Sequence, residues 1–87
     1  MHETGLVRDL IRCIDQAAVA HGAARVACVR VWLGALSHLS ATHFREHFLA
    51  ESRGGAAEGA ALEITESTDL ADPDAQHLRL ESLDLEV

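Results

Sequence analysis

The spacing of apolar residues begins with a pattern typical of an amphipathic helix. Apolar residues recur at helical intervals from Leu6 to Ala18, so one face of this segment is expected to be buried. Thr4 is a candidate N-cap, and His21-Gly22 is a candidate stop signal. Cys13 falls beside apolar positions of this face, so a buried, unreactive free thiol is expected there.

Alternating side-chain character then predicts a strand with one buried face from Arg25 to Leu33. Val29, Val31 and Leu33 point one way, whereas Cys28, Arg30 and Trp32 point the other. A tryptophan on the polar side is unusual. Trp32 either covers that face locally or is an exposed contact for a partner, and the pattern leaves both open.

A second helix is expected after the break at Gly34-Ala35-Leu36-Ser37. Ser40 can cap this helix, because its hydroxyl can accept a hydrogen bond from a backbone N–H of the first turn. Phe44 and Phe48 lie one turn apart and define the buried side. Gly54-Gly55 is expected to end the helix.

Two further strands complete the chain. Residues 62–66 alternate again, and residues 67–76 form a polar, acidic connecting loop that contains the only proline. Leu78 and Leu80 share one face of the last strand, but the apolar residues from Leu83 onward have the opposite phase. A bulge near Glu81-Ser82 would bring both sets to the core.

These elements predict an α+β fold, a two-layer sandwich with a three-stranded sheet and two helices on one face, in the order α-β-α-β-β. The short loop between the last two strands favours a hairpin between them. The length of 87 residues allows one domain, spanning residues 1–87.

Composition narrows the classes of function. The net charge of −7 argues against nucleic acid as a partner, because phosphates would be repelled. Between Glu58 and Val87 the sequence has nine acidic residues and a single basic one, Arg79. This imbalance indicates a solvated acidic surface or a docking surface for a basic partner. No stretch approaches the roughly 20 apolar residues of a membrane span, and no signal pattern opens the chain. A cytoplasmic location is therefore expected.

Cysteine and glycine patterns carry no enzyme signature. Cys13 and Cys28 are single and far apart, so they form neither a C-x-x-C metal pair nor a disulfide framework. The chain contains no G-x-S-x-G motif and no phosphate-binding glycine loop. We expect no catalytic residues and no enzyme activity.

Several short segments match, in order, the pattern of one known family. They are Met1-His2-Glu3, Gly34-Ala35-Leu36-Ser37, Ser52-Arg53-Gly54, Ala57-Glu58-Gly59-Ala60 followed by Leu62-Glu63-Ile64, and Leu78-Arg79-Leu80 with Ser82-Leu83. Together they resemble the HypA family of hydrogenase-maturation nickel chaperones. No gap is needed from Met1 to Ile64, so the resemblance covers most of the chain.

The resemblance implies a nickel site at the N-terminus. Ni(II) with nitrogen ligands favours square-planar geometry. The Met1 amine, the His2 amide nitrogen and a His2 imidazole nitrogen can form fused chelate rings around one ion. The fourth ligand stays open between the Glu3 amide, His77, His38 and a group on a partner. Affinity should rise with pH, because binding displaces protons from the amine and the amide.

Glu3 and the remaining histidines have other expected roles. The Glu3 carboxylate is expected to contact a partner or to favour the start of the following helix. His43 and His47 stand four apart, a spacing that can hold a metal, but they flank the buried phenylalanine face and are expected to be ordinary surface histidines. His21 suits the C-terminal end of the first helix.

One departure from the family pattern is large. The family carries a zinc-binding segment with paired C-x-x-C motifs between its second and third strands, whereas residues 67–76 contain no cysteine. A structural zinc site needs four ligands, usually thiolates or imidazoles, so no zinc is expected. A smaller departure is His38, where the family pattern more often has glycine.

By resemblance, the chain would be an accessory protein that delivers Ni(II) to the precursor of a nickel–iron hydrogenase large subunit, with a HypB-type GTPase as partner. The alternative is a nickel-free interaction or scaffold module in hydrogenase assembly. A homodimer is also open, because a strand reached through a shortened loop can swap between copies.

Overall fold

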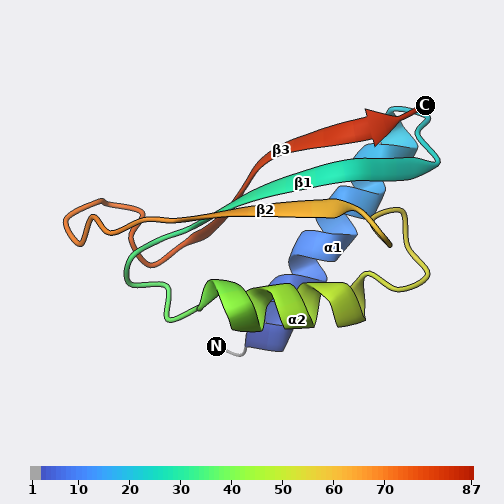
Figure 1. Ribbon diagram of the computed structural model, residues 1–87. Coiled ribbons are helices and arrows are strands. Elements are labelled where there is room, and N and C mark those ends of the chain that lie inside the picture. The colour runs from blue at the N-terminus through green and yellow to red at the C-terminus, as the bar shows by residue number, and fades with distance from the viewer. Residues whose placement is uncertain (1–2) are drawn as a thin grey trace.

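The computed structural model describes residues 3–87, and the side chains from residue 5 onward. The element order α-β-α-β-β is the expected one, with α1 at Glu3–Ala20, β1 at Arg25–Leu33, α2 at Ala41–Glu51, β2 at Ala61–Glu66 and β3 at Leu78–Glu86. Figure 1 shows both helices on the same side of the three-stranded sheet. The two-layer α+β prediction is confirmed.

The sheet has the strand order β2-β1-β3, so the predicted hairpin between the last two strands is wrong. β1 lies between them, parallel to β2 and antiparallel to β3. β1 is central because both of its faces are buried, with Val29 and Val31 against the helices and Cys28 and Trp32 on the other face. A parallel neighbour for β1 is consistent with the crossover through α2.

A bulge in β3 corrects the phase of its leucines, as predicted. Arg30 is opposite Ser82 and Val31 is opposite Leu80, which leaves Glu81 as the extra residue. The four leucines on either side of the bulge all pack against the core; they are Leu78, Leu80, Leu83 and Leu85. One strand therefore presents a continuous apolar face despite its broken alternation.

Helix α1 ends in a pair of hydrogen bonds around Gly22, whose φ is 66°. The Ala23 N–H donates to the Ala18 carbonyl at 2.8 Å, and the Gly22 N–H donates to the Val19 carbonyl at 3.1 Å. This is the Schellman arrangement, which favours glycine at the left-handed position. At the other end, α1 begins at Glu3, so Thr4 lies within the helix and is not the N-cap.

Helix α2 begins as predicted, with the Ser40 hydroxyl accepting a hydrogen bond from the His43 N–H at 3.1 Å. Phe44 and Phe48 are almost completely buried, and their ring centroids lie 6.0 Å apart. The helix ends at Glu51, and Gly54 lies just beyond it with a φ of 80°. Among the residues described, no helix is long and apolar enough to cross a membrane.

Candidate functional site

The predicted nickel ligands Met1 and His2 lie outside the described residues, and the side chain of Glu3 is likewise not described. The structure places the segment immediately after them. Helix α1 starts at Glu3, and its first turns include Leu6, which is half-buried, and Val7, which is fully buried. The predicted nickel-binding residues therefore lead straight into a helix anchored on the core.

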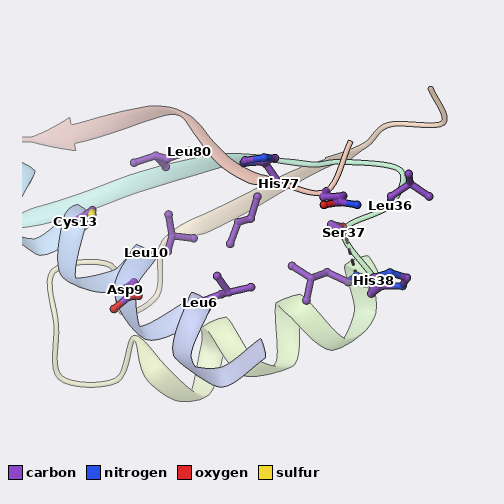
Figure 2. Close-up of a pocket in the computed structure, with 12 residues that line it drawn as sticks. Leu6, Asp9, Leu10, Cys13, Leu36, Ser37, His38, His77 and Leu80 are labelled. Atoms are coloured by element: carbon purple, nitrogen blue, oxygen red, sulfur yellow. Dashed lines mark hydrogen bonds between the residues drawn. The ribbon is translucent and has the colours of Figure 1, made fainter. Parts of the chain in front are cut away.

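A groove of about 940 Å³ lies beside these first turns of α1. Figure 2 shows three segments around it: α1, the loop after β1, and the start of β3. Its apolar lining is Leu6, Leu10, Leu36, Leu39, Leu78 and Leu80, and its polar lining is Asp9, Cys13, Ser37, His38, Gln76 and His77. Asp9 is the one lining residue with a formal charge at neutral pH, and its carboxylate accepts from Arg12 at 3.0 Å.

Both histidines considered as a fourth nickel ligand line this groove, His38 from the loop and His77 from just before β3. Figure 2 draws them on the part of the groove formed by the loop and the start of β3. Both side chains are exposed. His43 and His47 lie on α2 and do not line the groove. Within residues 5–87, no three His, Cys, Asp or Glu side chains come together as a metal site.

His38 has a φ of 61°, in the left-handed region that a residue with a Cβ seldom adopts. This backbone conformation accounts for the glycine that the family pattern more often has at this position. Leu39 N–H donates to the Ser37 hydroxyl at 3.4 Å, which holds the turn around His38.

The main chain of His77 is fixed by two hydrogen bonds. Its N–H donates to the Asp74 carbonyl, and its carbonyl accepts from the Gly34 N–H, both at 2.9 Å. A Cβ on Gly34 would lie 2.2 Å from the carbonyl oxygen of Ala75, so only glycine permits this approach. The glycine of the G-A-L-S motif therefore determines where the groove wall at His77 stands.

Other segments that match the family, and the chain next to them, also fix the backbone. Gly59 has a φ of 78° in the turn that precedes β2. Asp15 of α1 accepts a hydrogen bond from the Ala56 N–H at 3.1 Å, which fixes the segment after α2 to α1. Ser52 is buried, and its hydroxyl donates to the Leu49 carbonyl at 3.4 Å.

Cys13 is exposed, so the expectation of a buried thiol is wrong at this position. It stands at the edge of the apolar face of α1, where the groove leaves it uncovered. Cys28 is the buried cysteine, with its Sγ 3.6 Å from a Glu63 carboxylate oxygen. Burial raises the pKa of the Cys28 thiol above its ordinary value, with the neighbouring Glu63 acting in the same direction.

Trp32 is only 8% exposed, which contradicts its interpretation as an exposed partner contact and favours the alternative of local cover. The Arg79 guanidinium lies 4.0 Å above the ring centroid and also donates to Asp74 at 3.1 Å. This cation–π contact closes the outer face of the sheet over the indole.

Arg30 occupies the middle of the same outer face. It donates to both carboxylate oxygens of Asp84, at 3.1 and 3.0 Å, and to Glu63 at 3.2 Å. The hydrogen bonds from Arg30 hold the pKa of Asp84 below its usual range. They also raise the pKa of Arg30, so this arginine stays charged.

The sequence could not indicate the groove, because its walls come from three segments that meet only in the folded chain. A partial signal exists for α1, where Asp9 and Cys13 are four residues apart and therefore share a helix face. Leu36 and Leu39 carry no such signal. They become groove residues only because the loop that contains them folds back over Ala75.

Comparison with known proteins identifies the family of this chain. The family model described as "Hydrogenase/urease nickel incorporation, metallochaperone, hypA" matches residues 1–72. The hydrogenase maturation factor HypA of Azotobacter vinelandii is 35% identical over 66 residues, which are 76% of this chain and 58% of that protein. Its counterpart in Rhodopseudomonas palustris (strain BisB5) is 41% identical over 64 residues, or 74% and 57%. The chain thus spans little more than half the length of these relatives.

The fold agrees with this assignment. The solution structure of the Ni metallochaperone HypA from Helicobacter pylori superposes with a TM-score of 0.83 over 98% of this chain and 97% of that one, at 19% identity. On the family match and the identities together, this chain belongs to the HypA family of hydrogenase/urease nickel-incorporation metallochaperones, which are maturation factors and not enzymes.

Proposed function

We propose that this protein binds one Ni(II) ion at its N-terminus and delivers it to the precursor of a nickel–iron hydrogenase large subunit. The observation that carries the proposal is that the match to the nickel-incorporation family begins at residue 1, so it includes the Met1-His2-Glu3 opening. The Met1 amine and two nitrogens of His2 supply three ligands of a square-planar site.

Either His77 or His38 is the proposed fourth ligand when no partner group supplies it. Both line the groove that the first turns of α1 help to form, whereas His43 does not. Glu3 is proposed as a backbone ligand or as a contact to the partner. No zinc is expected to copurify, which elemental analysis of the untagged protein would check.

Calorimetric titration of Ni(II) into protein with a free N-terminus tests the site. We expect His2→Ala to weaken binding by at least about a hundredfold, because it removes an imidazole ligand and the chelate ring that it closes. His43→Ala is the matched control, since it removes an exposed histidine away from the groove and should leave affinity unchanged. Equal affinity of wild type and His2→Ala would reject the nickel site and leave the interaction-module alternative.

Delivery needs a separate measurement. Nickel-loaded protein would be mixed with the metal-free large-subunit precursor, with and without a HypB-type GTPase, and nickel in the re-isolated precursor counted. We expect transfer from wild type and none from His2→Ala. Association of both proteins with the precursor, without any transfer of nickel, would support the scaffold role instead.

A further inference from the structure

The two edges of the sheet differ in how they are protected. At the β2 edge, Arg45 of α2 donates to the Leu62 carbonyl at 3.1 Å, which occupies an edge acceptor. β3 forms the other edge, and Figure 1 shows it as the outermost strand on the side away from α2. It pairs with β1 on one side only, so a nine-residue edge presents its outward backbone groups for pairing.

The side chains along this edge are self-complementary. Consider two β3 strands, antiparallel, related by a two-fold axis that passes between Glu81 and Ser82. The axis sets Leu80 opposite Leu83 and Leu78 opposite Leu85 of the second copy. It also sets Arg79 opposite Asp84. Directly opposite apolar pairs and opposite-charge pairs are the arrangements that stabilise antiparallel strands.

The bulge makes this register compatible with the two faces of the sheet. Leu80 and Leu83 are an odd number of residues apart, so in a regular strand they would point to opposite faces. Because Glu81 is the extra residue, both leucines point to the core, and Arg79 and Asp84 both point to the outer face. Leu80 and Leu83 of two copies therefore share the core face when the axis sets them opposite each other, and Arg79 and Asp84 share the outer face.

Side chains on both faces of β3 can make further contacts with a second copy. All four leucines of β3 are only partly buried, so pairing would cover apolar surface that the single chain leaves open. On the outer face, the bond to Asp74 uses one nitrogen of Arg79, and a guanidinium carries five donors. Asp84 accepts two bonds from Arg30, and a carboxylate has about four acceptor positions.

We propose that β3 is the self-association edge of this protein, and that two copies pair through it, antiparallel about Glu81 and Ser82, into one continuous six-stranded sheet. The occupant is a second copy because the strand, aligned against itself in this register, places its one cation, Arg79, opposite Asp84 and places leucines opposite leucines. The proposal is independent of nickel binding.

A charge-exchange experiment with the full chain tests the register. Asp84→Arg sets two arginines against each other in the homodimer, and Arg79→Asp sets two aspartates against each other. We expect sedimentation velocity to show a concentration-dependent dimer for wild type, and a dissociation constant raised about tenfold or more for each variant. An equimolar mixture of the two variants should dimerise again, because each copy then supplies the complement of the other.

A folding defect cannot explain recovery of the dimer in the mixture. Mixing two variants restores dimers only if the variants pair with each other. A wild type that stays monomeric at the highest concentration reached would overturn the proposal. So would a mixture no more dimeric than its components, or variants that all associate like wild type.

Discussion

Gly34→Ala offers the sharpest test of how the groove wall is built. A methyl group there would lie 2.2 Å from the Ala75 carbonyl oxygen and 2.5 Å from its carbon, distances that real Cβ atoms essentially never show. Both contacts are backbone atoms, so no side chain can rotate away. The loop before β3 must retreat from Gly34.

That retreat strains or breaks two hydrogen bonds, from the Gly34 N–H to the His77 carbonyl at 2.9 Å and from the Leu36 N–H to the Ala75 carbonyl. Each is worth about 1 kcal/mol, and the overlap adds about 1–3 kcal/mol. The loss of unfolded-state freedom on replacing glycine by alanine returns about 0.4–1 kcal/mol. We expect a net destabilisation of about 3 kcal/mol, a large share of the stability of a small domain.

Urea unfolding followed by fluorescence of Trp32, the only tryptophan, measures this cost, since the indole is buried in the folded state. Gly5→Ala is the matched control: it lies in α1 with no heavy atom within 4 Å of the added methyl, and should stabilise by about 0.5–1 kcal/mol. If Gly34→Ala unfolds at the wild-type midpoint, the close approach of the loop to β1 does not exist in solution, and the groove loses its wall.

Three further predictions concern other residues. His38→Gly should stabilise the fold by about 0.5–1 kcal/mol in the same urea assay, because glycine adopts a φ of 61° without the cost borne by a residue with a Cβ; destabilisation would contradict the strain. Cys13 should react rapidly with a thiol reagent while Cys28 reacts only on unfolding, since burial raises the Cys28 pKa; a Cys13→Ser variant that still reacts rapidly would contradict this. Asp84 has a pKa lowered by Arg30, so its contribution to stability is complete above its unfolded pKa and is lost as pH falls through the folded value. Asp84→Asn should therefore lose less stability on acidification than wild type, and parallel acid profiles would refute the pairing.

Local features of the fold could be predicted because they depend on neighbours in sequence. The limits of β1, the Ser40 cap and the bulge at Glu81 each depend on the properties of a few adjacent residues. The error was the pairing order, which depends on burial across the whole chain. A signal was nonetheless present: Cys28 and Trp32 make β1 apolar on both faces, which is typical of a central strand.

Several residues in the segments that resemble the family are needed for backbone geometry. Gly34 permits a close approach, Gly54 and Gly59 adopt a positive φ, and Ser52 caps α2 from a buried position. Matching such residues identifies a fold, and a fold can be kept after its metal chemistry is lost. Nickel binding is therefore inferred from the opening residues alone, which this sequence has in the family's form. We therefore expect substitutions at Gly54 or Gly59 to change stability, whereas His2→Ala should change nickel affinity, and only the change in affinity bears on function.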